Sequence, residues 1–368
     1  MATFDRNKPY NNLPELPLPE EIIDREILKK WGLTSRVLAE LNRNILRIPN
    51  PSMLINTLAL QEAKSSTAIE NIFTTEDELY KAVSDSLKEE EANPSTKEVL
   101  RYREALWSGY KNLAEDQGFS MDTILHVFQK IKNTTQGIRP AQSQTVIKRG
   151  QSELRPGEVV YTPPRGEGVI QEKLDNMLEF LNEENSIDPL IKMAIAHYQF
   201  EAIHPFTDGN GRTGRVINLL YLVDQKLLSH PVLYLSKYII EHKDDYYYTL
   251  AAVTQRQAWK PWILYLLTAV ESTAIRTNQT IDEIMAQMDA TYAVVKQKLK
   301  WYSFELNQAL FSQPYIKPKL VGEITGSTSR TTLTKYMKAL VNLGVLSVNT
   351  DGREVFYVNN DLVRILES

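Results

Sequence analysis

The 368-residue sequence contains no cysteine and only five histidines. The absence of cysteine excludes disulfide bonds, a thiolate nucleophile, iron–sulfur clusters and cysteine-ligated zinc. The 42 Lys and Arg residues are offset by 46 Asp and Glu residues, which gives a formal net charge of −4. A basic surface for nucleic acid is therefore not expected over the whole chain, although one module could still carry one.

Long hydrophobic runs are also missing. The most apolar stretch, residues 262–270, is far shorter than the roughly 18–20 residues that a membrane span needs. Residues 1–8 have no apolar core of the kind that a signal peptide requires. We therefore expect a cytoplasmic protein without a membrane partner.

The chain length suggests two or three domains, and most of the sequence has helical periodicity. Apolar residues recur at three-to-four spacing before residue 135 and again over 169–183, 189–203, 212–228, 234–256 and 259–275. Between these regions, the β-type runs 145–147 and 159–161, separated by Gly150 and Pro156-Gly157, predict a β-hairpin. We predict a mainly α fold with a helical region over 1–110, a core domain over 111–275 and a third domain over 276–368.

The third domain shows the order helix, turn, helix, strand, turn, strand. A helix over about 328–343 ends at Gly344, and the β-type runs 345–348 and 355–358 follow. This order is typical of a winged helix, whose second helix usually contacts DNA. Arg330, Lys335 and Lys338 are available on that helix, whereas Asp351 and Glu354 of the wing oppose an anionic ligand. DNA binding and a protein-interaction or dimerisation role are therefore equally open.

One dodecapeptide has unusual chemistry. It runs His204-Pro-Phe206-Thr-Asp208-Gly209-Asn210-Gly211-Arg212-Thr-Gly-Arg215 and lies between two apolar helical segments. A glycine-punctuated loop that opens onto a helix N-terminus presents free amides to an anion, and Gly209 and Gly211 allow close backbone approach.

The polar side chains of this loop are those of a phosphoryl- or nucleotidyl-transfer site. Arg212 and Arg215 can bind phosphate oxygens with two donors each, and the Asn210 side chain can donate to another. Asp208 is a suitable oxygen ligand for Mg²⁺. His204 is the group best suited to act as a general base near neutral pH.

This string resembles the signature of the Fic family at every specified position, and the resemblance extends over nearly the whole chain. It implies a helical Fic core with a β-hairpin flap and a C-terminal winged helix. It also implies transfer of AMP from ATP to a Ser, Thr or Tyr hydroxyl of a target protein, with release of pyrophosphate. The related Doc toxins, which phosphorylate instead, have Ala and Lys where this chain has Gly209 and Gly211, so AMP transfer is favoured.

The resemblance also implies the role of each residue. His204 would deprotonate the target hydroxyl, Asp208 would bind Mg²⁺, and Phe206 would anchor the loop. The backbone of Gly209, Asn210 and Gly211 would form an anion hole, and Arg212 and Arg215 would bind the β- and γ-phosphates.

A second motif, Ser66-Thr-Ala-Ile-Glu70-Asn71, resembles the inhibitory motif of the same family. The resemblance implies that Glu70 pairs with Arg215. Glu70 would then occupy the donors of Arg215 and repel the γ-phosphate, so that the enzyme is self-inhibited.

The remaining expectations are less specific. The hairpin resembles a flap that positions a target segment by strand pairing, although Lys148 and Arg149 stand where a Gly pair is typical. Tyr246, with Leu250 and Thr254 at helical spacing, resembles the lining of an adenine pocket, and core filling is an equal alternative for Tyr246. We interpret His197 as a core histidine.

Two functional alternatives stay open. The first is a Fic enzyme that uses another nucleotide or removes AMP. The second is a DNA-binding regulator whose Fic domain only senses nucleotide. The expected partners are ATP and an unknown target protein, with a homodimer also open.

Overall fold

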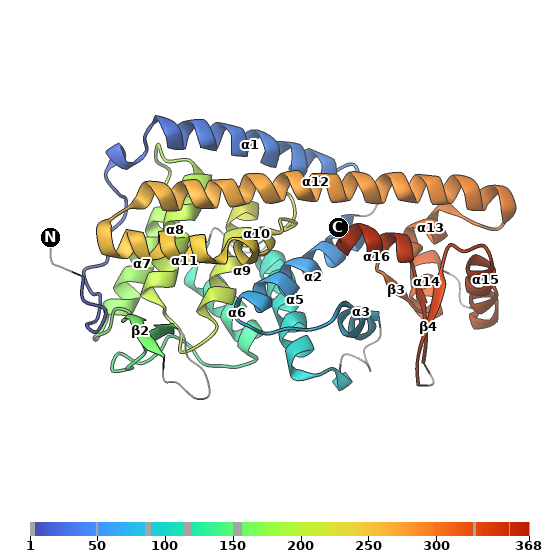
Figure 1. Cartoon of the computed structure of the whole chain (residues 1–368), viewed down its shortest axis with the longest axis horizontal. Coiled ribbons are helices and arrows are strands. Elements are labelled where there is room, and N and C mark those ends of the chain that lie inside the picture. Colours follow the sequence, from blue (N-terminus) through green and yellow to red (C-terminus); the bar gives the residue numbers. More distant parts are fainter. Residues whose placement is uncertain are drawn as a thin grey trace.

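The computed structural model describes residues 4–48, 51–84, 90–113, 119–149, 157–326, 329–352 and 354–367. The predicted mainly helical fold is confirmed (Figure 1). The helices before the C-terminal region are η1 (Glu20–Ile22), α1 (Arg25–Ile45), α2 (Pro51–Ile69), α3 (Glu76–Ser84), α5 (Pro94–Leu113), α6 (Met121–Lys132), α7 (Val169–Asn182), α8 (Pro189–Ile203), α9 (Asn210–Asp224), α10 (Leu235–Glu241), α11 (Lys243–Arg256) and α12 (Trp259–Lys298).

Helix α8 lies at the centre of the core. It is apolar around its whole circumference, and nearly all of its residues are buried, as expected for a helix that is surrounded by others. It begins cleanly because the Asp188 side chain accepts a hydrogen bond from Leu190 N (2.8 Å) and Pro189 occupies the first turn. Helices α7, α9 and α12 pack against it, so the loop between α8 and α9 is fixed at both ends.

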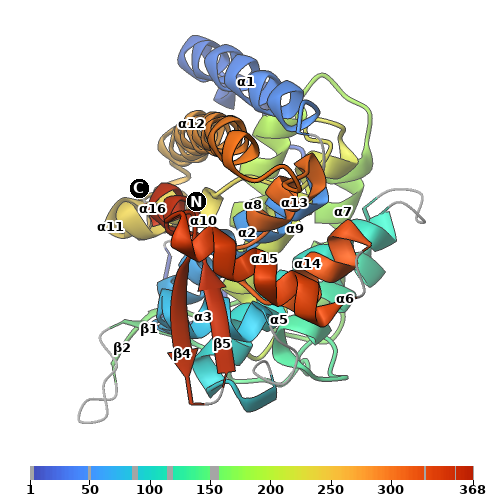
Figure 2. The same ribbon diagram turned by 90° about the vertical axis from the view of Figure 1, so that its right-hand side faces the viewer.

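Helices α1 and α12 run side by side along one edge of the molecule (Figures 1 and 2). Helix α12 has 40 residues, and it extends well beyond the predicted segment 259–275 because Ile281, Ile284 and Met288 continue its buried face. The domain boundaries that we expected at 110 and 275 therefore lie inside continuous helices, α5 and α12. The single helix predicted over 234–256 is instead two helices, α10 and α11, which are separated at His242.

The predicted hairpin is present as β1 (Ile147–Arg149) and β2 (Glu158–Tyr161), paired antiparallel with Ile147 opposite Tyr161. Its first strand begins two residues later than the β-type run 145–147. Gly150 and Pro156, which we expected in the turn, lie outside the described residues.

The C-terminal region consists of α13 (Phe304–Leu310), β3 (Tyr315–Ile316), α14 (Pro318–Thr325), α15 (Arg330–Asn342), β4 (Ser347–Asp351), β5 (Glu354–Val358) and α16 (Asn360–Glu367). The predicted helix–turn–helix and strand–turn–strand order is present, and the short strand β3 makes an antiparallel sheet in the order β3-β5-β4. Position 328, where we expected the second helix to begin, lies outside the described residues.

The C-terminal sheet is docked on the N-terminal helix α3. Asp77 of α3 accepts hydrogen bonds from the Tyr315 hydroxyl (2.8 Å) and from Asn349 Nδ2 (3.1 Å). One face of the wing is thus occupied by the protein itself. Within the described parts of the chain, no helix combines the length and apolar character that a membrane crossing would require.

Candidate active site

The loop between α8 and α9 is held by two internal clamps. Asn210 is buried, and its amide both accepts from Phe206 N (2.9 Å) and donates to Phe206 O (2.8 Å). The Phe206 ring is buried in a stack on Phe128, with ring centroids 3.8 Å apart. Both polar atoms of the Asn210 side chain thus hold the loop in this conformation, and its contact with a phosphate stays a prediction.

The N-terminus of α9 provides the anion-binding element. Gly209 precedes the helix with φ of 81°, and the first intrahelical bond runs from Thr213 N to Gly209 O (3.0 Å). The amides of residues 210–212 therefore precede the hydrogen-bonded ladder, at the positive end of the helix dipole. A Cβ atom at Gly211 would collide with Glu70 Oε1, so the Glu70 carboxylate sits directly over this helix start.

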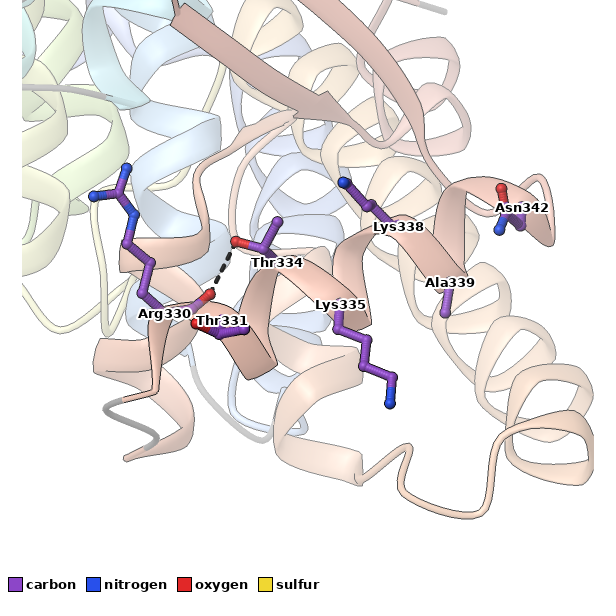
Figure 3. Close-up of a pocket in the computed structure, with 7 residues that line it drawn as sticks. All are labelled: Arg330, Thr331, Thr334, Lys335, Lys338, Ala339 and Asn342. Carbon is purple, nitrogen blue, oxygen red and sulfur yellow. Dashed lines mark hydrogen bonds between the residues drawn. The ribbon is translucent and has the colours of Figure 1, made fainter.

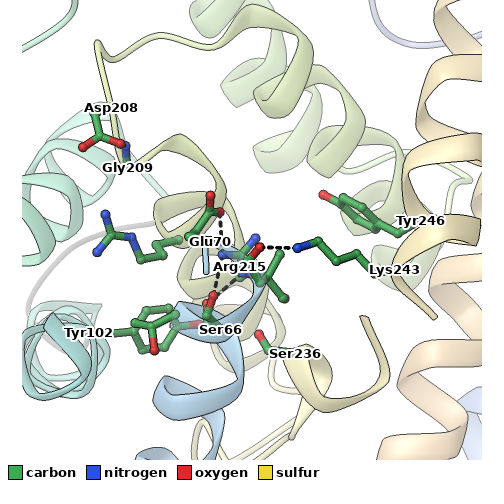
Figure 4. Close-up of polar contacts among 12 residues, drawn as sticks. Ser66, Glu70, Tyr102, Asp208, Gly209, Arg215, Ser236, Lys243 and Tyr246 are labelled. Carbon is green, nitrogen blue, oxygen red and sulfur yellow. Dashed lines mark hydrogen bonds and ion pairs between the residues drawn. The ribbon is translucent and has the colours of Figure 1, made fainter. Parts of the chain in front are cut away.

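Arg215 is fully buried beneath that carboxylate (Figure 4). Its Nε donates to Ser66 Oγ (2.7 Å), and its Nη2 donates to Ser66 O (3.0 Å) and Glu70 Oε1 (3.0 Å). Burial disfavours the charge on Arg215, but Glu70, together with Tyr102, Tyr246 and Glu201, holds the pKa of the guanidinium above its ordinary value. The end of α2 therefore satisfies three donor contacts of Arg215 in this conformation.

Arg212 does not converge with Arg215. Its buried guanidinium is paired with Glu98 of α5. We expected both arginines to face phosphate; Arg212 instead pairs with Glu98 in this structure, and its phosphate contact stays a prediction. The reason is that α5 supplies an acid which the local spacing on α9 could not reveal.

Asp208 is the one acid of the loop sequence 204–215, and its side chain is 67% exposed. Its Oδ1 accepts from Gly209 N (2.6 Å), and its Oδ2 lies 2.5 Å from Lys132 Nζ. Burial opposes ionisation, but Lys132, the Gly209 amide and Arg212 together lower the pKa of Asp208.

A magnesium ion fits this donor set only in one way. Among the residues that the structure describes, no three His, Asp or Glu side chains gather as a metal cluster. Asp208 would supply one oxygen, and phosphates and waters would supply the rest, which is the usual arrangement for Mg²⁺. Lys132 would have to give up its contact with Asp208.

His204 ends α8 in the left-handed conformation (φ 51°) and lines a cleft. Burial, reinforced by the nearby cation Arg139, lowers the pKa of His204 to about 4. The imidazole is therefore neutral at pH 7 and able to accept a proton.

Arg139, which the sequence did not single out, fixes the backbone on which His204 stands. It is buried, with Nε donating to His204 O (2.8 Å) and Nη2 donating to Pro164 O (2.6 Å) and Ile203 O (3.2 Å). A single arginine in an irregular segment gives no sequence signal for such a contact.

The cleft has a volume of about 660 Å³. It is bounded by the end of α2, the flap strands, α8, the start of α9 and α11. Its lining includes Glu70, Lys148, Arg149, Tyr198, Glu201, His204, Gly211, Arg215, Lys243, Tyr246, Tyr247, Leu250 and Thr254. The expected catalytic histidine, inhibitory glutamate, flap and α11 residues thus meet in one cavity.

Three family models match consecutive parts of the chain. They are the Fic/DOC family N-terminal domain over residues 28–111, the Fic/DOC family domain over 118–222, and the C-terminal domain of SoFic-like protein adenylyltransferases over 287–362. The chain belongs to the Fic/DOC family.

Relatives of this Fic chain match it over limited lengths. The protein adenylyltransferase fic-1 of Caenorhabditis briggsae is 30% identical over 154 residues, which are 41% of this chain and 27% of that protein. A probable protein adenylyltransferase of Aquifex aeolicus is 39% identical over 71 residues, 19% of this chain and 22% of that protein. The chain therefore spans about a quarter of the length of these relatives.

Solved structures support the Fic fold. A Fic family protein from Desulfovibrio desulfuricans superposes with a TM-score of 0.53 at 19% identity, covering 94% of this chain and 98% of that one. Fic-1 from C. elegans gives a TM-score of 0.52 at 21% identity, with 70% and 74% covered.

Tyr246 forms a buried wall of the Fic cleft. Its hydroxyl is 3.0 Å from His197 Nε2, and its ring lies against Trp262. His197 is a core residue, as interpreted from the sequence, and burial lowers its pKa to about 3. The neighbouring Tyr247 is 43% exposed and also lines the cleft. Its ring is therefore more accessible than that of Tyr246 for stacking against a nucleobase.

Two further cleft residues were missed in the sequence. Lys243 Nζ donates to Ile69 O (2.6 Å) at the end of α2, which Figure 4 shows on the side of Arg215 away from Asp208. Burial raises the pKa of Glu201 to about 7, with Arg215 opposing the rise and Glu70 adding to it. Glu201 could have been found, because it lies one helical turn before His204.

Proposed function

We propose that this Fic protein is a protein adenylyltransferase that transfers AMP from ATP to a Ser, Thr or Tyr hydroxyl of another protein. The observation that carries the proposal is the juxtaposition, in one cleft, of the N-terminus of α9, the neutral His204 and the buried Arg215. The names of the relatives support the same activity.

The chain's residues supply each part of this reaction. His204 takes the proton of the target hydroxyl, whose oxygen then bonds to the α-phosphorus as the bond to the pyrophosphate oxygen breaks. The amides at the start of α9 stabilise the charge on the phosphoryl oxygens, and Arg215, once released, binds the leaving pyrophosphate. Mg²⁺ held at Asp208 would neutralise phosphate charge.

Intact-mass measurement tests the activity directly. The full chain is incubated with ATP, UTP or GTP in separate reactions, with His204→Ala as the inactive reference. One AMP adduct per modified hydroxyl, seen only with ATP, supports the proposal. Adducts of another nucleotide, or loss of AMP from a modified substrate, would favour the alternative Fic enzymes instead.

Self-inhibition by Glu70 is part of the proposal. The carboxylate occupies both the start of α9 and the donors of Arg215, which are the positions that phosphates need. Ser66 adds two acceptors from the preceding turn of α2. The binding of ATP in a productive position therefore requires that the end of α2 move.

Replacing Lys243 with alanine is expected to release this inhibition in part. Lys243 places a cation on the last carbonyls of α2, a contact worth about 0.3–1 kcal/mol. Its loss should therefore raise basal AMP transfer about two- to fivefold, and should add nothing in a Glu70→Gly background. Lys237→Ala is the matched control, because Lys237 pairs with Glu241 on its own helix, α10. A fall in activity would instead assign Lys243 to nucleotide binding.

A second candidate function rests on α15. Arg330, Lys335 and Lys338 are exposed along one face of a helix that contains no Asp or Glu (Figure 3). Such a face can contact DNA phosphates, as a DNA-binding regulator requires. Because the wing is docked on α3, it is not available for an additional contact with a DNA groove.

A homodimer and a cytoplasmic location stay predictions.

Duplex DNA binding at several salt concentrations tests that candidate. Three phosphate contacts predict a slope of about −3 in log affinity against log salt. Lys335→Glu with Lys338→Glu should abolish binding, whereas Lys319→Glu on α14, where Lys319 pairs with Glu323, should not. Binding that is absent at low salt, or equal in all variants, would exclude this function.

A further inference from the structure

Glu201 stands between the two ends of the cleft. Along α8, Tyr198 marks one end, because its hydroxyl lies 3.0 Å from Thr254 Oγ1 of α11. His204 marks the other end, beside the start of α9. Glu201 lies one turn from each of them on the same wall.

One oxygen of the Glu201 carboxylate has no hydrogen-bond partner in the part of the chain that the structure describes. Its Oε1 is buried and accepts no hydrogen bond within the described residues. The hydrogen bonds of Arg215, a cation that acts electrostatically on Glu201, go to Ser66 and Glu70 instead. A buried polar atom without a partner is uncommon, and in a ligand cleft it indicates an acceptor whose donor comes with the ligand.

The Glu201 carboxylate lies in a space next to α9 that a side chain at position 214 would fill. A Cβ atom at Gly214 would lie 2.8 Å from Glu201 Oε1 and 3.0 Å from Phe200 Cδ1. Only glycine at that position of α9 therefore allows the carboxylate to lie where it does. The acid is built into the contact between α8 and α9 and is not a side chain that happens to point inwards.

The groups at the two ends of the cleft determine which part of a bound nucleotide lies beside Glu201. If phosphates occupy the amides at the start of α9 and the base lies against Tyr247 and Leu250 of α11, the sugar falls in the middle. Carboxylates are a common recognition group for ribose hydroxyls, since each oxygen accepts a hydrogen bond from one of them.

We propose that Glu201 accepts hydrogen bonds from the ribose hydroxyls of the bound nucleotide and makes the site selective for ribonucleotides. This inference rests on the proposed adenylyltransferase function. Release of inhibition favours the interaction, because Glu70 raises the pKa of Glu201 and its departure from the cleft leaves Glu201 more fully ionised.

Calorimetric titration of the full chain with ATP and with 2′,3′-dideoxy-ATP tests the proposal. In the Glu70→Gly background, ATP should bind at least about tenfold more tightly than the dideoxy analogue. Adding Glu201→Ala should bring the two affinities within about twofold. Glu201→Gln preserves the shape but replaces a charged acceptor with a neutral one, so the preference should fall severalfold. Glu172→Ala, which removes an exposed acid of α7 that does not line the cleft, is the control and should retain the full preference.

The outcomes separate the two proposals. An unchanged preference in Glu201→Ala or Glu201→Gln, in a chain that binds ATP and transfers AMP, overturns the role of Glu201 alone. A Glu70→Gly chain that binds both nucleotides equally also overturns it. A Glu70→Gly chain that binds neither nucleotide overturns the adenylyltransferase proposal together with it.

Discussion

Replacing Glu70 with glycine is expected to raise AMP transfer by about 10- to 100-fold over the unaltered chain. In the structure, the Glu70 carboxylate lies 3.0 Å from Arg215 Nη2 and covers Gly211 at the start of α9. A hydrogen bond to a charged group contributes about 1.5–3 kcal/mol, and its removal makes Arg215 and the α9 amides available to phosphate. The measurement is the initial rate of adduct formation by intact mass at a fixed ATP concentration.

Matched variants show whether the effect comes from the carboxylate. Glu70→Gln keeps the volume but not the charge and should give an intermediate rate. Glu104→Gln removes an acid that pairs with Lys130 on the protein surface and should leave the rate unchanged. Self-inhibition would be disproved if the folded Glu70→Gly protein bound ATP and formed adducts no faster than the parent chain.

The contiguous part of the site could be predicted from the sequence, because a glycine-rich loop between two apolar helices places its own residues together. His204, Gly209 and Gly211 lie as that spacing implies, at the junction of α8 and α9. The contact between Glu70 and Arg215 was expected only through resemblance, since 145 positions separate the two residues. The general fold was predictable for the same reason as the loop: periodicity is a local signal.

Contacts between distant segments were not predictable. Arg212 faces Glu98 because α5 packs against α9, and nothing within the loop indicates that neighbour. The roles of Arg139 and Lys243 depend likewise on carbonyls of other elements. Helix α12 was predicted too short because the composition changes after residue 277, although its apolar face continues.

Replacing His204 is expected to cause the largest loss in the rate of AMP transfer. In the Glu70→Gly background, His204→Ala should lower the rate of AMP transfer about 10²- to 10⁴-fold, which is the usual contribution of a positioned general base. ATP affinity should change little, because the phosphate donors come from α9 and Arg215. The measurement pairs the rate of adduct formation with calorimetric ATP binding. Equal losses of rate and of binding would show that His204 only supports the pocket.

The pH dependence of the Glu70→Gly rate provides an independent check on His204. Burial lowers the pKa of His204 to about 4, so the proton-accepting imidazole is already neutral throughout pH 6–8. At saturating ATP, where changes in nucleotide affinity do not affect the rate, the rate should therefore be nearly constant over that range. It should fall as the pH drops toward 4, where the imidazole becomes protonated. The Glu70 substitution sharpens this expectation, because Glu70 itself raises the pKa of His204 and its removal moves the fall to lower pH. A rate that halves near pH 6.5 would mean that the base titrates in a water-exposed environment, and His204 as it lies in this cleft would not be that base.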